Sequence, residues 1–204
     1  MRVIAGKAKG CKLKSVPGKS TRPITDRAKT ALFNILGNDV IGSRFLDLFA
    51  GTGGVGIEAL SRGAKFATFV EKDPRIIAVL KKNIEKARFV KESKVIKANA
   101  FAIGAPVILN ESRYNLVFVD PPYAATMNAG EDSALAGLMD ILNDQITNDG
   151  IVIVRTSHEV SLLERYGPFQ IEERRLWGTM AVTILTKTEC DIRHTQDDIR
   201  NNDQ

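Results

Sequence analysis

From residue 44 onward, short β-prone apolar runs alternate with segments of helical periodicity, and this alternation limits the possible folds more than any other feature of the sequence. The β-prone runs cover residues 45–49, 66–71, 94–98, 116–120 and 151–155, and the helical segments between them include 54–62, 74–88 and 134–141. Such alternation is typical of a parallel sheet with helices on both of its faces. We therefore predict an α/β fold.

Two further β-prone runs, 169–177 and 180–185, are separated only by Gly178 and Thr179. A two-residue connection is too short for the crossover that parallel strands need, so these two strands must be antiparallel. We predict a seven-stranded mixed sheet with a C-terminal antiparallel hairpin, followed by a polar, disordered tail over residues 187–204.

The N-terminal residues have a different pattern. β-prone pieces at 1–5 and 12–16 lie around Gly6 and Gly10, and a Pro-Gly pair at 17–18 closes the stretch, which predicts a small hairpin. We therefore divide the chain into an N-terminal hairpin extension (1–20), a main domain (21–186) and the tail.

Asp26 opens an amphipathic helix that Gly37 ends. Its apolar residues recur at helical spacing, so we expect one face to pack on the core. The residues of that face are Ala28, Ala31, Leu32 and Ile35.

Positive charge is concentrated at the N-terminus. The chain has 29 lysine and arginine residues against 24 acidic ones, a net charge of +5. Residues 1–29 hold nine of the basic residues and one acid, Asp26. A basic arm on a near-neutral body is the electrostatic pattern of a nucleic-acid binder, although a solvated surface would look the same.

The sequence lacks the features of a membrane-spanning protein, of a secreted protein and of a metal-binding protein. No apolar run approaches the ~20 residues that cross a bilayer, and the N-terminus has no signal-peptide core. Cys11 and Cys190 lack metal-type spacing, and His158 and His194 stand apart from other ligands. We expect a cytoplasmic protein with no metal site and no membrane contact.

A glycine-rich segment follows the first predicted strand. Gly51, Gly53 and Gly56 fit G-x-G-x-x-G at the start of a helix, and Glu71 stands at the end of the next strand. Such a loop lets the backbone approach a ligand, and the acid can accept ribose hydroxyls. The motif suits a nicotinamide dinucleotide or S-adenosylmethionine. Asp47 favours the second, since a carboxylate repels a pyrophosphate but suits a ligand carrying an ammonium and a sulfonium.

The fourth predicted strand of this region delivers Asp120-Pro121-Pro122-Tyr123 to the carboxyl edge of the sheet. An exocyclic amine on a nucleobase is a poor nucleophile because its lone pair is delocalised into the ring. Asp120 and the Pro121 carbonyl can accept its N–H groups, the prolines fix the backbone, and Tyr123 offers a face for a base outside its stack. A strand-terminating turn with a surface tyrosine is the structural alternative.

These motifs, in this order, resemble class I S-adenosylmethionine-dependent methyltransferases that act on amino nitrogens, and in particular the RsmD family of 16S rRNA guanine-N2 methyltransferases. The resemblance covers roughly residues 1–185, and its N-terminal part is the most specific. It rests on residues 1–6, 10–13, 21–27, 31–36, 45–53, 56–64 and 69–73.

The resemblance implies a Rossmann-like methyltransferase domain and a cofactor site. S-adenosylmethionine would lie over Gly51 and Gly53, with Asp47 near its methionine end and Glu71 on its ribose. Asn99-Ala100 stands where the family usually has an acid-containing pair against the adenine, and Asn99 could bind the adenine amine through its amide oxygen. The remaining cofactor residues implied are Phe49, Ala50, Thr52, Lys72 and Asp120.

The resemblance also implies how the protein acts. It would methylate the N2 amine of a guanine in 16S rRNA, either free or within the assembling small ribosomal subunit, as a monomer, without a metal, and with S-adenosylhomocysteine as product. Asp120, Pro121, Pro122 and Tyr123 would be catalytic. The RNA-binding residues would be Arg2, Lys7, Lys9, Lys12, Lys14, Arg22, Thr25 and Arg27.

Other functions remain open from the sequence. An amino-methyltransferase could act on adenine N6 of DNA or RNA or on a protein glutamine. Methyltransferases of protein glutamine usually have Asn in place of Asp120. A nicotinamide-dependent oxidoreductase would need a second region for its substrate, which the chain lacks. A non-catalytic RNA-binding module would not need Asp120.

Overall fold

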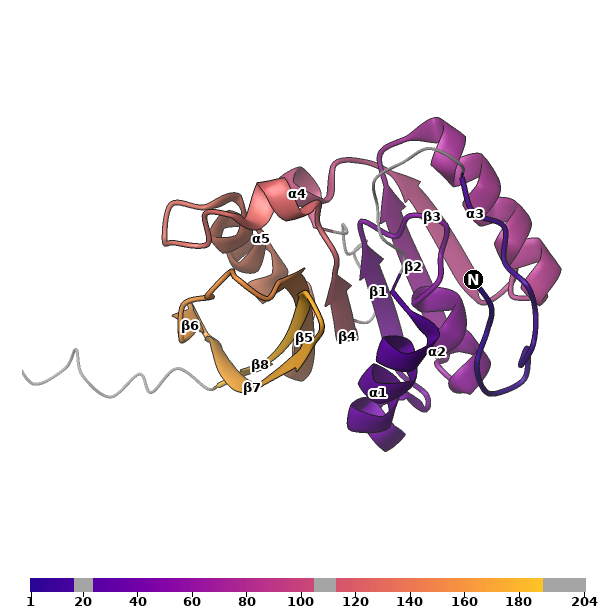
Figure 1. Cartoon of the computed structure of the whole chain (residues 1–204), viewed down its shortest axis with the longest axis horizontal. Coiled ribbons are helices and arrows are strands. Elements are labelled where there is room, and N and C mark those ends of the chain that lie inside the picture. Colours follow the sequence, from indigo (N-terminus) through magenta and orange to yellow (C-terminus); the bar gives the residue numbers. More distant parts are fainter. Residues whose placement is uncertain (17–23, 105–112, 189–204) are drawn as a thin grey trace, which may run out of the picture.

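The computed structural model describes residues 1–16, 24–104 and 113–188 (Figure 1). One mixed sheet runs through the molecule in the strand order β3-β2-β1-β4-β5-β8-β7-β6. The strands are β1 (Arg44–Leu48), β2 (Phe66–Glu71), β3 (Ser93–Lys97), β4 (Tyr114–Val119), β5 (Ile146–Ser157), β6 (Arg165–Tyr166), β7 (Phe169–Trp177) and β8 (Met180–Lys187). The helices are α1 (Asp26–Leu36), η1 (Gly37–Val40), α2 (Gly56–Arg62), α3 (Pro74–Ala87), α4 (Ala100–Ile103), η2 (Tyr123–Thr126) and α5 (Ala134–Asn143).

The predicted α/β fold and C-terminal hairpin are confirmed. Strands β1 to β5 are parallel to one another, and β8 is antiparallel to both β5 and β7. The sheet has eight strands rather than seven. The extra strand, β6, is a two-residue edge strand that pairs with Phe169 and Gln170 of β7, and so short a segment has no periodicity that a sequence could reveal.

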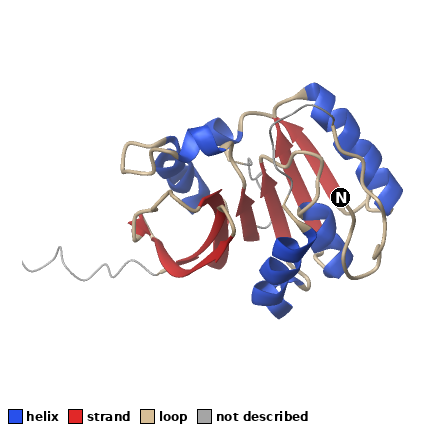
Figure 2. Ribbon diagram, viewed as in Figure 1, coloured by secondary structure: helices blue, strands red, loops and turns tan. Residues whose placement is uncertain are grey.

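Two apolar cores lie on opposite faces of the sheet, because successive side chains of each strand point to opposite sides. Phe45 and Phe69 belong to the core that contains α1, α2 and α3, whereas Leu46 and Val70 belong to the core that contains α5. Figure 2 shows the helices on either side of the strands. This arrangement leaves the carboxyl ends of the central strands open to ligands.

The first helix begins and ends as predicted, but its buried face differs. The Thr25 hydroxyl accepts a hydrogen bond from Ala28 N at 3.2 Å, and Gly37 is the C-cap. Ala31 and Ile35 are only half-buried, whereas Lys29 and Phe33 are buried. The face is rotated because α1 packs on the N-terminal segment as well as on the sheet.

The N-terminal segment, residues 1–16, folds back on itself so that its two halves run antiparallel. Arg2 and Lys12 form an isolated antiparallel β-bridge between them. Its backbone is held by the carboxylate of Glu58 on α2, which accepts from Ile4 N at 2.7 Å and from Ala5 N at 3.0 Å. The predicted hairpin is present, with Val3 N donating to Cys11 O and Leu13 N donating to Met1 O, and it lies across α2. We call residues 1–16 the strap. Its closing turn at 17–18 lies outside the described residues, as does almost all of the predicted tail.

The described helices include none with the length and apolar character needed to cross a membrane.

Candidate active site

A cavity of about 880 Å³ lies at the carboxyl ends of β1, β2 and β4. This volume falls within the ~300–1,000 Å³ typical of small-molecule sites. Most of the predicted cofactor and catalytic residues line it: Asp47, Phe49, Ala50, Gly51, Thr52, Glu71, Lys72, Asn99, Ala100, Asp120, Pro121, Pro122 and Tyr123. The structure thus brings both motifs to one cavity.

The glycine loop holds a constrained backbone. Phe49 has φ of 60°, an uncommon value for a residue with a side chain, and its ring meets that of Phe101 edge-on at 4.7 Å. Gly53, predicted to contact the cofactor, is not among the residues that line the cavity. A Cβ at Gly53 would lie 2.4 Å from Leu80, so this glycine allows the loop to pack on α3.

Glu71 ends β2 with its carboxylate fixed by three backbone donors. Its Oε2 accepts from Gly51 N at 3.1 Å, and its Oε1 accepts from Lys72 N and Asp73 N, each at 2.9 Å. A carboxylate has about four acceptor positions, so this arrangement leaves capacity for a hydroxyl. Glu71 therefore ties the glycine loop to the end of β2 while facing the cavity.

Asp47 is the most buried acid of the cavity, with 2% of its surface exposed. Its Oδ2 accepts a hydrogen bond from Gly56 N at 2.9 Å. Burial raises the pKa of Asp47 well above 3.8, the Gly56 hydrogen bond opposes this, and the charges of Asp120 and Glu71 add to it. Three carboxylates around one cavity fit a cationic ligand such as S-adenosylmethionine and oppose the pyrophosphate of a dinucleotide.

Asn99 is the N-cap of α4, where its Oδ1 accepts from Phe101 N at 3.3 Å. The amide oxygen expected to face an adenine therefore already has a backbone partner. It retains a second lone pair, so contact with adenine stays a prediction.

Asp120 follows β4 directly, and 25% of its side chain is exposed. Its backbone N donates to Leu48 O at 3.3 Å, which places it beside the end of β1. Pro122 precedes the short helix η2, which begins at Tyr123. The tetrapeptide therefore leaves the sheet next to the glycine loop.

Sequence reasoning missed Arg155, on β5. Its side chain is 7% exposed, and its Nη1 lies 2.8 Å from Asp120 Oδ2. The guanidinium carbon lies 5.8 Å from the centre of the Tyr123 ring. The signal in the sequence is an arginine at the end of the apolar β-prone run 151–155, but the run itself does not reveal that its strand lies beside the one that leads to Asp120. Other cavity residues that sequence reasoning missed include Ser157, His158, Glu159 and Thr179.

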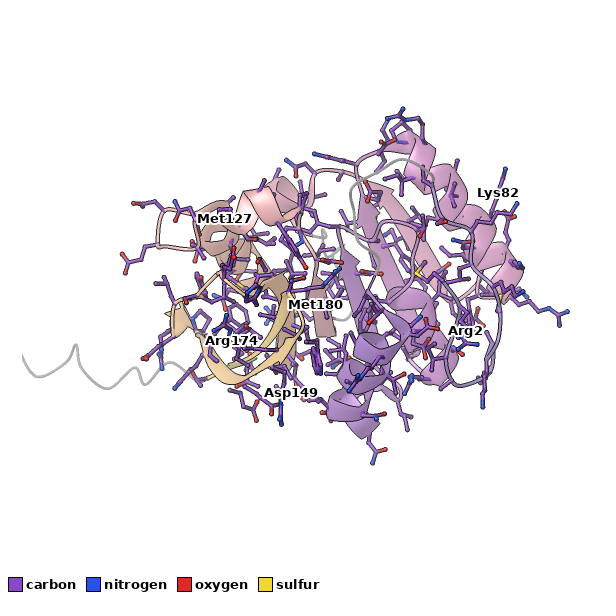
Figure 3. All side chains as sticks on the ribbon, viewed as in Figure 1. Arg2, Lys82, Met127, Asp149, Arg174 and Met180 are labelled. Atoms are coloured by element: carbon purple, nitrogen blue, oxygen red, sulfur yellow. The ribbon has the colours of Figure 1, made fainter. Side chains whose placement is uncertain are left out.

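Most predicted RNA-binding residues lie on the surface. Arg2, labelled in Figure 3, pairs with Asp26 at 2.9 Å, and Thr25 caps α1. Arg22 lies outside the described residues. The exposed members of the set are Arg2, Lys7, Lys9, Lys12, Lys14, Thr25 and Arg27.

Lys29 is the last of the nine basic residues in positions 1–29, and it does not belong to a basic surface. Its side chain is fully buried, with Nζ 3.3 Å from Glu58 Oε2 and 2.6 Å from Arg2 O. A buried ammonium paired with a buried carboxylate adds no positive charge to the surface.

A mixed sheet of this topology with a ligand cavity at the ends of its parallel strands defines a Rossmann-like class I methyltransferase. The Escherichia coli protein yhhF has this fold, with a TM-score of 0.76 and 29% identity over 92% of this chain and 98% of that chain. An RNA methyltransferase from Salinibacter ruber, in complex with S-adenosyl-L-homocysteine, shares the fold at 17% identity, with a TM-score of 0.60 over 83% of this chain and 95% of that one.

Sequence comparisons identify the family to which the chain belongs. A family model described as "Conserved hypothetical protein 95" matches residues 1–186. The chain is 36% identical over 192 residues to Ribosomal RNA small subunit methyltransferase D of Escherichia coli, covering 92% of this chain and 90% of the relative. It is 35% identical over 189 residues to YlbH of Bacillus subtilis, covering 92% and 99%. The chain belongs to the RsmD family of S-adenosylmethionine-dependent rRNA methyltransferases, as the resemblance predicted.

Proposed function

We propose that the protein transfers the methyl group of S-adenosylmethionine to the N2 amine of a guanine in 16S rRNA of the small ribosomal subunit. The observation that carries the proposal is Asp120, whose carboxylate faces the same cavity as the glycine loop and Glu71. Similarity to Ribosomal RNA small subunit methyltransferase D of Escherichia coli supports the choice of rRNA.

The chemistry of Asp120 favours guanine over adenine. An ionised carboxylate only accepts hydrogen bonds. Guanine carries two adjacent donors, N1–H and the N2 amine, whereas the N6 amine of adenine stands next to N1, an acceptor that repels a carboxylate. The ion pair with Arg155 supports an ionised Asp120.

The cofactor would be held by residues of three strand ends. Glu71 would accept ribose hydroxyls, Asp47 would lie near the charged methionine end, and Asn99 with Ala100 would contact the adenine. Contacts from Phe49, Ala50, Gly51, Thr52 and Lys72 would complete the site. When bound, S-adenosylmethionine supplies a methyl group already activated by its sulfonium.

The protein's own catalytic work is to position and polarise the amine. The Asp120 carboxylate and the Pro121 carbonyl accept its N–H groups, Pro122 fixes the turn, and Tyr123 stacks on the flipped base. Transfer of the methyl group from the sulfonium sulfur to the nitrogen would release S-adenosylhomocysteine, and the nitrogen would lose one proton to Asp120 or to water.

The RNA would approach the basic strap. Arg2, Lys7, Lys9, Lys12 and Lys14 are exposed there, with Arg27 on α1, and they can neutralise phosphates. Arg22 and Thr25 complete the proposed RNA-binding set. We further propose a monomer that works in the cytoplasm, on naked 16S rRNA or on the assembling subunit.

Nucleoside analysis of methylated RNA tests the proposal. The purified protein is incubated with labelled S-adenosylmethionine and either 16S rRNA or small subunits from a strain lacking the gene, and the Asp120→Ala variant is the control. The expected product is N2-methylguanosine at one position. A methyl group on adenine N6, or on protein alone, would replace the proposal with one of the alternatives. Absence of transfer to either RNA substrate would refute it.

A further inference from the structure

We propose that Arg155 is a positioning residue for the methyl transfer, which orients the Asp120 carboxylate and holds it in its charged form while the target amine binds the other oxygen. This inference rests on the proposed function. Arg155 lies outside both sequence motifs, on the neighbouring strand of the sheet.

The register of the sheet places the two residues together. Val119 of β4 pairs with Val154 of β5 in a parallel ladder, so Asp120 and Arg155 are the next residues along the two strands. Arg155 Nη1 donates to Asp120 Oδ2 at 2.8 Å. Within residues 1–16, 24–104 and 113–188, no donor contacts Oδ1, which leaves that oxygen for the substrate.

The guanidinium of Arg155 is itself held from two sides. Its Nε donates to the Met180 sulfur at 2.7 Å, and the Tyr123 ring lies 5.8 Å from its central carbon. Met180, labelled in Figure 3, begins β8 and pairs with Ser157 of β5. Arg155 thus contacts the first and last residues of the Asp120-Pro121-Pro122-Tyr123 motif at once, and its planar group suits both contacts better than an ammonium would.

The charges around Asp120 explain why it needs this partner. Burial raises the pKa of Asp120, and the charge and hydrogen bond of Arg155 oppose that rise. Asp47 of β1 and Glu71 of β2 bring negative charge to the same cavity, which His158 and Glu159 also line. Without Arg155 the carboxyl would take up a proton more readily and lose acceptor capacity toward the amine.

Two measurements on the full-length protein test the inference. The pKa of Asp120 is followed by NMR in protein carrying ¹³C-carboxyl aspartate, with Asp120→Asn assigning the signal. Single-turnover methylation of 16S rRNA is measured against pH. For Arg155→Met we expect the Asp120 pKa to rise by about one unit or more, since a nearby opposite charge shifts a carboxyl by ~1–3 units. The acidic limb of the rate profile should move up by the same amount, with cofactor affinity within about threefold.

Two further variants separate charge from packing. Arg155→Lys keeps the charge, so the Asp120 pKa and the acidic limb should stay near wild type while the maximal rate falls. Arg155→Gln removes the charge and replaces Arg155→Met if that variant does not fold. Arg44→Met is the matched control, because Arg44 also lies over aromatic rings, 5.4 Å from Phe66, but at the start of β1. It should change neither the Asp120 pKa nor the rate profile.

If the wild type is active but the Asp120 pKa is unchanged in Arg155→Met and Arg155→Gln, the proposed function stands and this inference is overturned. A raised pKa without a shift of the acidic limb also overturns it, because the pair would then be structural. If the wild type does not methylate 16S rRNA, the proposed function fails, and the role of Arg155 in methyl transfer fails with it at any measured Asp120 pKa.

Discussion

Lys29 and Glu58 form an ion pair in which neither side chain is exposed to solvent, with Nζ 3.3 Å from Oε2. The same carboxylate accepts the backbone N–H groups of Ile4 and Ala5 and an N–H of Arg62, and Lys29 also donates to the carbonyl of Arg2. A helix residue from α1 and one from α2 therefore fasten the N-terminal strap to the main domain.

Removing either member of this pair should destabilise the protein strongly. We expect Lys29→Met to lower the free energy of unfolding by about 3–5 kcal/mol, because it leaves Glu58 buried without its ammonium partner. Arg2→Ala, which breaks an exposed pair with Asp26, should cost less than about 1 kcal/mol. Urea unfolding of both variants measures the difference, and equal small losses would contradict a buried, energetically important pair.

Asp120→Ala should lower turnover by about 10²–10³, the usual loss when one preorganised polar group is removed, with cofactor affinity within a few-fold. Asp120→Asn is the companion variant, since its amide oxygen can still accept from Arg155. Calorimetric titration with cofactor and single-turnover rates distinguish the two effects. Parallel losses of cofactor binding and of rate would mean that Asp120 acts through the cofactor rather than on the target amine.

Glu71→Ala should weaken S-adenosylmethionine binding by about 1.5–3 kcal/mol, the range for charge-assisted hydrogen bonds, and saturating cofactor should largely restore the rate. Glu71 also holds Gly51 N, so Glu71→Gln, which keeps acceptor oxygen for the loop, separates loop support from charge. Isothermal titration of both variants gives the affinities. Wild-type affinity in Glu71→Ala would exclude Glu71 as the ribose ligand.

The raised pKa of Asp47 makes stability and ligand binding depend on pH in opposite directions. A carboxyl whose folded pKa lies above 3.8 stabilises the ligand-free fold at low pH, and this contribution is lost as pH rises through the folded pKa. Asp47→Asn should remove this pH-dependent loss of folding stability, because the amide does not titrate, while its oxygen can still accept from Gly56 N.

Cofactor affinity of the wild type should instead increase over the same pH range, because a cationic ligand favours the ionised carboxylate. Urea unfolding and calorimetry from pH 3.8 upward measure both trends, and Asp39→Asn at an exposed site is the control. Flat profiles in the wild type would show that Asp47 does not titrate in this range.

Replacing Lys7, Lys9, Lys12 and Lys14 with Gln should weaken RNA binding and flatten its salt dependence, by about 0.7–0.9 in the log–log slope for each phosphate that is no longer neutralised. Cofactor affinity should not change, because these side chains are exposed and the strap is anchored through its backbone, including Lys14 N to Asn83 Oδ1 at 2.8 Å. Lys65→Gln with Lys91→Gln, at exposed sites outside the strap, is the control. Coincident salt slopes would direct the search for RNA contacts to Arg27 and the Tyr123 side of the cavity.

Local patterns in the sequence determined most of the elements. The predicted runs 66–71 and 169–177 coincide with β2 and β7, and the helix from Pro74 differs by one residue at its end. Periodicity, caps and two-residue turns act within a few residues, so they can be read without knowing the fold. The order of the glycine loop, Glu71 and Asp120 along the strands also placed these residues at one edge of the sheet, because parallel strands end together.

Tertiary structure alone decided which partners the charged residues have. Arg155 and Asp120 are 35 positions apart and meet because β4 and β5 are neighbours in a particular register. The sequence places Lys29 in a basic segment, but packing between α1, α2 and the strap buries its side chain completely. Burial and pairing over such separations depend on how whole elements pack, and they determine whether a charge faces RNA, supports a carboxylate or fastens the fold.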